Sequence, residues 1–220
     1  MDESEGVVRS AIASDTAAPT RAAWLTFLLQ WLKNPRSMSS VAPSGRQLAS
    51  MMVGAMPAAA GHVVELGAGT GAITNALLAH GILPSQLLIV EMNPVLHGVL
   101  QQGFPEAHVV CGDARRLDKI VAGRPVFADR KIDAVVSSLG LLAMPSSVQR
   151  DILHAAFAVL RPGGVFVQYT YGLATPVARE VREELGLHCE RIGCAWWNLP
   201  PARVFVYRRG ADAPDGGMNN

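Results

Sequence analysis

The chain carries an acidic side chain at the end of three short apolar runs, and a glycine-rich turn follows the first of them. Glu65 stands two residues before Gly67, where a carboxylate can face a cationic amino group. Glu91 ends the second run, from which a carboxylate can accept hydrogen bonds from both ribose hydroxyls. Asp113 follows the third run and can accept a hydrogen bond from an adenine amino group. Together these acids predict a site for one ligand that offers an ammonium group, a ribose and an adenine.

The turn at residues 67–71 reads Gly-Ala-Gly-Thr-Gly, and its glycines allow a sharp reversal and the close approach of a ligand. With Ala72 it also matches a dinucleotide-binding fingerprint, and glycine turns occur in proteins that bind nothing there. Glu65 decides between these interpretations, because its carboxylate would repel a pyrophosphate. The ligand that fits all three acids is S-adenosylmethionine. We expect its site to contain Glu65, Gly67, Ala68, Gly69, Thr70, Gly71, Glu91, Met92, Asn93, Gly112, Asp113, Ala114 and Ser137, with no metal ion.

Apolar runs alternate with helical patterns around these residues. Nearly continuous apolar strands are typical of a parallel sheet that helices cover on both faces. The last two runs lie close together without a crossover helix, which indicates an antiparallel hairpin at the sheet edge. We therefore predict an α/β fold with a Rossmann-like, doubly wound, seven-stranded sheet. The predicted strands are 62–66, 86–91, 108–110, 132–137, 165–171, 188–196 and 202–207, and the predicted helices are 72–80, a segment from Asn93-Pro94, 148–160 and 176–185.

Composition and charge limit the class of protein. The chain has 220 residues, 50% of them hydrophobic, and this length suits one α/β domain. Its 19 basic and 18 acidic residues give a net charge of +1, which leaves no overall field to attract nucleic acid. No apolar stretch reaches the roughly 18 residues of a transmembrane helix. The acidic start does not resemble a secretory signal, so we expect a cytoplasmic protein.

Changes in composition divide the chain into four segments. We expect a mobile arm at 1–20, a helical preface at 21–55, the α/β domain at 56–209 and a disordered tail at 210–220. The three cysteines, Cys111, Cys189 and Cys194, show no Cys-x-x-Cys spacing. We expect them to be small buried residues in a reducing compartment, without disulfides or bound zinc.

Four motifs stand in the order and spacing of the class I S-adenosylmethionine-dependent methyltransferases, which the chain resembles. They are ELGAGTG at 65–71, IVEMN at 89–93, CGDAR at 111–115 and LRPGG at 160–164. The resemblance covers about residues 44–208. It implies S-adenosylmethionine as methyl donor and S-adenosylhomocysteine as product, and it leaves the methyl acceptor open.

Residues 21–33, RAAWLTFLLQWLK, predict an amphipathic helix. Trp24, Phe27, Leu28 and Trp31 fall at helical spacing, opposite a narrow polar stripe. Such a helix can lie in a lipid interface, where tryptophan and basic flanks anchor it. It can equally pack on the domain as an active-site lid, or on a partner. The interpretations are compatible if the lid faces a membrane.

The loop after the predicted fourth strand reads SSLGLL at 137–142. Enzymes that methylate adenine or glutamine nitrogen typically carry Asn/Asp-Pro-Pro-Tyr/Phe there, and this apolar loop lacks that clamp. The chain more narrowly resembles the bacterial phospholipid N-methyltransferases of the rhizobial type. The resemblance rests on FLLQWLKNPRSMSSVAPSGRQLAS, IVEMNP, SSLGLLAMP, FVQYTYG and WWNLPPARVFVYRR. Ala68 stands where we expect a proline in the glycine loop, and a backbone turn tolerates either residue.

This narrower resemblance implies methylation of phosphatidylethanolamine and its mono- and dimethylated forms toward phosphatidylcholine. It also implies a phospholipid substrate at an anionic membrane surface, peripheral membrane association and no nucleic-acid partner. The expected acceptor residues are Tyr169, Tyr171, Trp196, Trp197, Arg203 and His97. Aromatic faces hold methylated ammonium groups, and a guanidinium can bind a phosphate with two hydrogen bonds.

Each acceptor residue also has a structural interpretation. The four aromatic residues can be core residues of two adjacent strands, and alternation suggests that one of the two tryptophans is buried. Arg203 can be a surface arginine paired with an acid. His97, like Asn93, can touch acceptor or cofactor, although a lone histidine is more often structural. Other acceptors also stay open: a methyltransferase of adenine in rRNA or of small soluble molecules, or a non-catalytic partner subunit.

Overall fold

The computed structural model describes residues 43–128, 131–196 and 200–210. The predicted arm at 1–20, the predicted amphipathic helix at 21–33 and the predicted tail at 210–220, apart from Gly210, lie outside these ranges, as does Trp197. The described strands are β1 (Val63–Leu66), β2 (Leu87–Glu91), β3 (His108–Cys111), β4 (Ile132–Ser137), β5 (Leu160–Thr170), β6 (Leu187–Ala195) and β7 (Ala202–Arg209). The described α-helices are α3 (Pro43–Gly54), α4 (Ala72–Ala79), α5 (Pro94–Gly103), α6 (Leu117–Ala122), α7 (Pro125–Ala128), α8 (Ser146–Val159) and α9 (Arg179–Glu184), and the 3-10 turns are η1 (Pro84–Gln86), η2 (Ala114–Arg116) and η3 (Leu141–Ala143).

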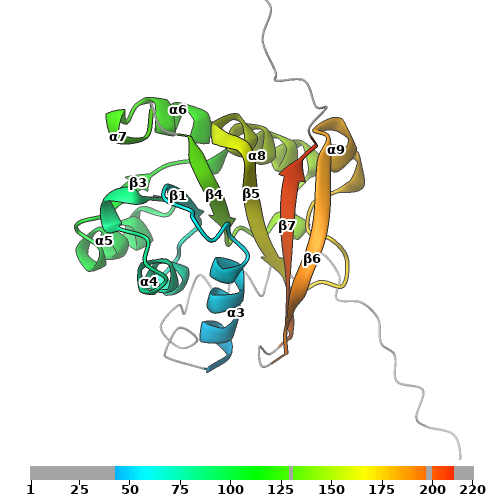
Figure 1. Ribbon diagram of the computed structural model, residues 1–220, viewed down its shortest axis with the longest axis horizontal. Coiled ribbons are helices and arrows are strands. Elements are labelled where there is room, and N and C mark those ends of the chain that lie inside the picture. The colour runs from blue at the N-terminus through cyan, green and yellow to red at the C-terminus, as the bar shows by residue number, and fades with distance from the viewer. Residues whose placement is uncertain (1–42, 129–130, 197–199, 211–220) are drawn as a thin grey trace, which may run out of the picture. The chain divides into compact units, whose positions relative to one another are not determined.

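The strands form one seven-stranded sheet in the order β3-β2-β1-β4-β5-β7-β6 (Figure 1). The first five strands are parallel, whereas β7 is antiparallel to both β5 and β6. This order confirms the predicted doubly wound sheet with an antiparallel edge hairpin. The sheet extends from β1 in both directions, so the strand order reverses at the carboxyl ends of β1 and β4. We call this end of the sheet the crevice, because open α/β sheets bind ligands at such a reversal.

Helices cover both faces of the sheet (Figure 1), because alternate side chains of each strand point to opposite faces. On one face Met52 of α3, Leu77 of α4 and Leu100 of α5 are buried in a cluster with alternate strand residues. The other face packs on α6, α8 and α9. Glu65 and Glu91 each stand two residues after a member of the first cluster, Val63 and Ile89, and therefore point to the face that α3, α4 and α5 cover. Within the described ranges, no helix is long and apolar enough to cross a membrane.

The structure departs from the predicted elements at three places. Strand β5 begins at Leu160, because this residue pairs with Ile132 before the Arg-Pro-Gly-Gly segment shifts the register. Helix α9 begins only at Arg179, since residues 175–178 remain non-helical after a proline at 176. Helices α6 and α7, with 6 and 4 residues, are too short to show a helical period in the sequence.

Asp133 connects the amino end of β4 to the residues before β1 by hydrogen bonds. Its carboxylate accepts hydrogen bonds from the backbone N–H groups of Gly61 (2.8 Å) and His62 (2.9 Å) and from Arg161 Nε (2.5 Å). Burial raises the pKa of Asp133, but the hydrogen bonds from His62, Arg161 and Gly61 outweigh this and hold the pKa below its ordinary value. The ionised form is therefore the one that stabilises the fold.

We expect Asp133→Ala to lower the free energy of unfolding by about 2 kcal/mol at pH 7, because the variant loses hydrogen bonds to a charged, mostly buried carboxylate. A carboxylate whose pKa is lower in the folded state than in the unfolded state stabilises the folded state at pH values above its ordinary pKa of about 4. This stabilisation is lost as the pH falls through the pKa of the folded state. Urea denaturation should therefore show the difference between variant and wild type shrinking as the pH falls below about 4. An equal difference at all pH values would contradict the role of the charge.

Candidate active site

The glycine-rich turn connects β1 to α4 at the crevice. Gly67, Gly69 and Gly71 all adopt left-handed backbone conformations, with φ of 70°, 59° and 85°. Residues with a Cβ rarely adopt this region, which explains the glycine at every second position. Gly67 N donates to Val90 O (2.8 Å) and so continues the β1–β2 ladder before the chain turns. Ala68 is buried and Thr70 is half-buried.

Glu91 ties the glycine loop to the loop that follows β2. Its Oε2 accepts from Gly69 N (3.0 Å) and its Oε1 from Asn93 N (2.9 Å). Asn93 in turn caps α5, because its Oδ1 accepts from Val95 N (2.9 Å). A carboxylate has about four acceptor positions, so each oxygen of Glu91 keeps capacity for one further donor. A pair of ribose hydroxyls, as expected from the sequence, would need two such acceptor positions.

Glu65 is fully buried beside the same loop. Its Oε2 accepts from Thr74 Oγ1 (2.6 Å), while its Oε1 has no hydrogen-bond partner among the described residues. Burial is the main cause that raises the pKa of Glu65 to about 7, the hydrogen bond from Thr74 opposes it, and Glu91 adds to the rise. A buried carboxylate oxygen without a partner is costly, and a cationic donor would satisfy it.

Asp113 lies at the carboxyl end of β3, but its carboxylate turns toward a neighbour in the chain. It accepts from Arg115 N (3.0 Å), Arg115 Nε (2.9 Å) and Arg115 Nη2 (2.5 Å). The hydrogen bond from Arg115 is the main cause that lowers the pKa of Asp113. The ionised side chain therefore keeps about one of its four acceptor positions for a ligand. Its neighbours Gly112 and Ala114 are half-buried.

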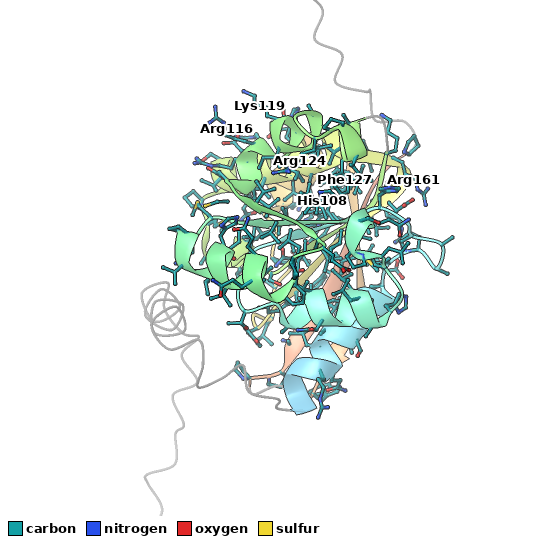
Figure 2. All side chains as sticks on the ribbon, turned by 90° about the vertical axis from the view of Figure 1, so that its left-hand side faces the viewer. His108, Arg116, Lys119, Arg124, Phe127 and Arg161 are labelled. Carbon is teal, nitrogen blue, oxygen red and sulfur yellow. The ribbon has the colours of Figure 1, made fainter. Side chains whose placement is uncertain are left out.

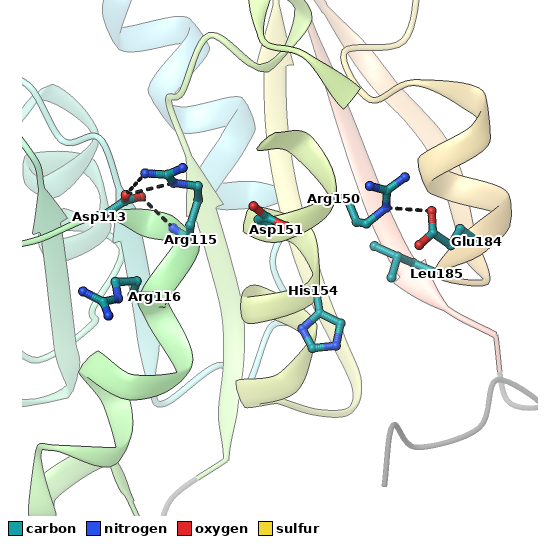
Figure 3. A pocket seen from close by; sticks show the side chains of 8 residues that line it. All are labelled: Asp113, Arg115, Arg116, Arg150, Asp151, His154, Glu184 and Leu185. Carbon is teal, nitrogen blue, oxygen red and sulfur yellow. Dashed lines mark hydrogen bonds and ion pairs between the residues drawn. The ribbon is translucent and has the colours of Figure 1, made fainter. Parts of the chain in front are cut away.

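A cleft of about 520 Å³ lies next to Asp113, between η2, α8 and the end of α9 (Figure 3). It is lined by Asp113, Arg115, Arg116, Arg150, Asp151, His154, Glu184 and Leu185. Its walls carry both signs of charge, and Arg150 Nε pairs with Glu184 (2.7 Å) across one end. The glycine loop and Glu65 are not among these residues. The cleft therefore shares Asp113, but no residue of the glycine loop, with the predicted cofactor site.

The loop that follows β4 is held against its neighbours by polar contacts. Ser137 is fully buried, and its Oγ accepts from Leu139 N (3.3 Å). The buried Gln168 of β5 donates from Nε2 to Leu139 O (2.8 Å). The Leu139 side chain lies against Gly67, since a Cβ added at Gly67 would come within 2.8 Å of Leu139 Cδ2. This loop therefore forms one wall of the glycine turn.

Two tyrosines extend the site from the carboxyl end of β5. Tyr169 and Tyr171 are half-buried on the face that α3 and α4 cover, with ring centroids 5.4 Å apart and planes at 79°. Burial is the main cause that raises the pKa of Tyr169, and Tyr171 adds to it, so the Tyr169 hydroxyl stays neutral. The structure thus brings together two of the predicted acceptor aromatics, on the same face as Glu65 and Glu91.

The other predicted acceptor residues lie around this pair or outside it. Arg203 of β7 is half-buried and its Nη1 donates to Gly172 O (3.1 Å), one residue beyond Tyr171. Trp196 is 71% exposed after β6, so it is not a core residue. His97 is half-buried in α5, and Met92, expected at the cofactor, is exposed after β2.

The cysteines differ in part from the expectation of small buried residues. Cys111 is exposed, because β3 forms an edge of the sheet, whereas Cys189 and Cys194 are half-buried. All three are free thiols. The prediction of burial is therefore wrong for Cys111.

Three polar residues of the site were not predicted from the sequence. Thr74 bonds to Glu65, Arg115 bonds to Asp113, and Gln168 supports the loop after β4. Thr74 lies among the apolar residues of α4, where a polar side chain at a buried position is a usable signal. Gln168 breaks the apolar run of β5 in the same way.

Gly71 provides a test of the loop. In Gly71→Ala the left-handed backbone costs about 1–2 kcal/mol, and the new Cβ would lie 2.5 Å from Phe104 Cε2. With overpacking of about 1–3 kcal/mol, we expect the free energy of unfolding to fall by about 2–5 kcal/mol. The matched control is Gly81→Ala, where φ is +102° and no atom lies within 4 Å of the added Cβ. Equal losses in urea denaturation would contradict the tight contact with Phe104.

Comparison with known proteins gives two sequence matches. Residues 63–164 match the family model described as a methyltransferase domain. Over 148 residues the chain is 34% identical to the ornithine lipid N-methyltransferase of Singulisphaera acidiphila, and the match covers 66% of this chain and 76% of that protein. The family match spans every strand from β1 to β4 and the start of β5.

Solved structures share the fold at low sequence identity. The N-methyltransferase NodS from Bradyrhizobium japonicum, in complex with S-adenosylhomocysteine, has a TM-score of 0.59 at 18% identity and covers 84% of this chain and 97% of its own. A TehB-like S-adenosylmethionine-dependent methyltransferase from Corynebacterium glutamicum has a TM-score of 0.55 at 20% identity, covering 87% and 100%.

Proposed function

This chain belongs to the class I S-adenosylmethionine-dependent methyltransferases, and we propose that it is a phospholipid N-methyltransferase that acts on the amine of phosphatidylethanolamine. We include the mono- and dimethylated forms of this lipid as substrates, so that successive transfers lead toward phosphatidylcholine. The observation that carries the proposal is a pair of edge-to-face tyrosines beside uncharged loops, at the same crevice as the predicted cofactor site.

The residues at the crevice fit S-adenosylmethionine as methyl donor. Glu65 Oε1 is a buried carboxylate oxygen without a partner among the described residues, and it would accept from the ammonium group. Glu91 would accept from the ribose hydroxyls, and Asp113 from the adenine amino group. Bound there, S-adenosylmethionine supplies an electrophilic methyl group to the acceptor nitrogen. The glycine loop lets this ligand approach the backbone without a clash.

The chain's own residues would position the acceptor and exclude water. Methyl transfer depends mainly on holding the nitrogen about 3–3.5 Å from the methyl carbon and in line with the bond that breaks. The amine must be neutral to attack, and a site with little water disfavours its ammonium form. The segments at 138–145 and 171–178, which we call the uncharged loops, contain no Asp, Glu, Lys or Arg. The uncharged loops therefore supply surroundings that disfavour the ammonium form of the amine.

The tyrosines and Arg203 would bind different parts of the lipid headgroup. The faces of Tyr169 and Tyr171 can hold a methylated ammonium group, and the guanidinium of Arg203 can bind the lipid phosphate. Arg203 already donates to Gly172 O, so it would bind the phosphate through its other N–H groups. Trp197 and His97 remain candidates for the same headgroup. We propose no general base, since a path for the proton to water is sufficient.

Ornithine lipid is the second candidate acceptor, because of the 34% identity to an ornithine lipid N-methyltransferase. An ornithine headgroup offers an amine and a carboxylate, whereas phosphatidylethanolamine offers an amine and a phosphate. Arg203 can bind either anion. The proposed partner is in both cases a lipid at an anionic membrane surface, and the protein would be cytoplasmic and peripherally membrane-associated.

Radiolabelled methyl transfer to vesicles tests the proposal. The vesicles would contain phosphatidylethanolamine, its monomethyl form, its dimethyl form or ornithine lipid, each as separate substrate in an anionic background. We expect label in the ethanolamine lipids and its loss in Glu65→Gln. Label in ornithine lipid alone would show that ornithine lipid, and not phosphatidylethanolamine, is the acceptor. Label in no lipid, while S-adenosylmethionine still binds, would overturn the lipid proposal and leave rRNA adenine and small soluble amines to be assayed.

A further inference from the structure

Three large apolar side chains are exposed on the loops at the carboxyl edge of the sheet. Leu142 follows β4 and is 39% exposed, Leu173 follows β5 and is 86% exposed, and Trp196 follows β6 and is 71% exposed. We call these three residues the apolar rim. Because β6 runs parallel to β5 through its pairing with β7, all three lie at the same edge of the sheet.

Contacts of intervening residues connect the members of the apolar rim. The Leu142 side chain lies against the backbone of Gly172, since a Cβ added there would overlap Leu142 Cδ2. Arg203 donates to Gly172 O, next to Leu173. On the other side Arg203 follows Ala202, which pairs with the last residue of β6, directly before Trp196. The members of the apolar rim therefore follow one another along the same edge of the sheet, and Arg203 lies between the loop after β5 and the end of β6.

The surface differs in charge from the opposite edge of the sheet. Both uncharged loops belong to it, and residues 192–196 carry no charge either. The amino edge instead carries ionic side chains: Arg161 pairs with Asp133 at the start of β4, and Arg124 precedes α7. Figure 2 shows Arg124, Arg161 and Lys119 in the upper part of the view, away from α3 at the bottom. The loops after β4 and β5 and the end of β6 thus carry no charge, and the guanidinium of Arg203 lies beside the loop after β5.

We propose that the apolar rim is a membrane-insertion surface, in which Leu142, Leu173 and Trp196 enter the outer part of a lipid bilayer while Arg203 meets the phosphates. A bilayer fits because the side chains come from separate loops and the loops bring no charge that would be dehydrated on insertion. Tryptophan favours the boundary between headgroups and acyl chains. Arginine at the same level can bind lipid phosphate.

The proposed membrane-insertion surface lies next to the proposed acceptor site. Tyr171 precedes Gly172 and Leu173 in the same loop, so a lipid whose chains stay in the bilayer would bring its headgroup to the tyrosine pair without leaving the membrane. This inference rests on the proposed lipid substrate. It adds a second membrane contact, distinct from the predicted helix at 21–33, which lies outside the described residues.

Co-sedimentation with phosphatidylethanolamine–phosphatidylglycerol vesicles tests the inference on the full chain. We expect Leu173→Asp and Trp196→Asp each to weaken vesicle binding about tenfold, because an acid must be dehydrated at an anionic surface. The matched control is Leu83→Asp, an apolar residue that is 57% exposed before β2, at the amino edge. It should bind vesicles like the wild type. Equal losses in all three variants, or no loss in any, would overturn the inference.

A second readout separates this inference from the proposed function. With a short-chain phosphatidylethanolamine below its micelle concentration, Leu173→Asp should lose much less of its methylation rate, relative to the wild type, than it loses on vesicles. A wild type that binds vesicles through the rim but labels no lipid would overturn the proposed function alone. A wild type that does not bind vesicles, or whose self-association is abolished by the same substitutions in analytical ultracentrifugation, would overturn the membrane surface.

Discussion

Glu65→Gln is expected to stabilise the free protein at alkaline pH while it weakens S-adenosylmethionine binding by about 10- to 100-fold. The weaker binding follows from the loss of a charge-assisted hydrogen bond to the ammonium group. The gain in stability follows from the burial of Glu65, whose ionisation the fold opposes. A single substitution would thus show that the ionised Glu65 strengthens cofactor binding while it lowers the stability of the folded chain.

The direction of the pH dependence follows from the pKa. Burial raises the pKa of Glu65 from an ordinary value of 4.5 to about 7 in the folded chain. Between these values the folded state holds a proton that the unfolded state has lost, so the stability of the wild type falls as the pH rises. At about 1.4 kcal/mol per pH unit, the cost of ionisation reaches about 3 kcal/mol above pH 7. Glutamine carries no such cost.

Denaturation of wild type and variant at a series of pH values measures this difference. The free energy of unfolding of Glu65→Gln relative to the wild type should rise between pH 4.5 and pH 7 and then level off. The control is Glu106→Gln, an exposed glutamate outside the site, for which we expect no comparable trend. Calorimetry should show wild-type affinity for S-adenosylmethionine falling below pH 7. A constant difference in stability, or unchanged affinity in the variant, would contradict the assignment of Glu65.

The sheet could be predicted from the sequence because its strands are buried on both faces. Leu87–Glu91 and Ile132–Ser137 show this as nearly continuous apolar runs, and the structure confirms both within one residue. Asn93 and Pro94 correctly indicated the start of α5, since an asparagine cap and a proline in the first turn have a local mechanism. The short helices α6 and α7 have no such signal and depend on tertiary contacts.

The candidate site could be predicted only in part, for a similar reason. Glu65 and Glu91 interrupt apolar strands, so their burial at a strand end follows from position alone. The pairing of Asp113 with Arg115 was not evident, because spacing in a sequence does not show which of several nearby arginines an acid will bind. The exposure of Trp196 was equally hidden, since strand alternation does not extend beyond the last paired residue of β6.

Tyr171→Leu is expected to lower kcat/KM by about 30-fold for dimethylated phosphatidylethanolamine, and by less for the unmethylated lipid. A cation over a dehydrated aromatic face gains about 2 kcal/mol, which leucine cannot supply. The effect should grow with the number of methyl groups, because a methylated ammonium loses hydrogen-bond donors and depends more on the ring. Tyr171 contacts Tyr169 edge to face, so the loss of one ring also leaves the second without its support.

The matched variant is Tyr171→Phe, which keeps the ring and removes the hydroxyl. If the aromatic face binds the headgroup, radiolabel assays on the three ethanolamine lipids should give Tyr171→Phe near-wild-type rates and Tyr171→Leu a graded loss. Binding of S-adenosylmethionine, measured by calorimetry, should be unchanged in both, since Glu65 and Glu91 lie on other strands. Equal losses in the two variants would assign the effect to the hydroxyl. A loss that is the same for all three lipids would show that the ring supports the loop after β5 and does not bind the methylated amine.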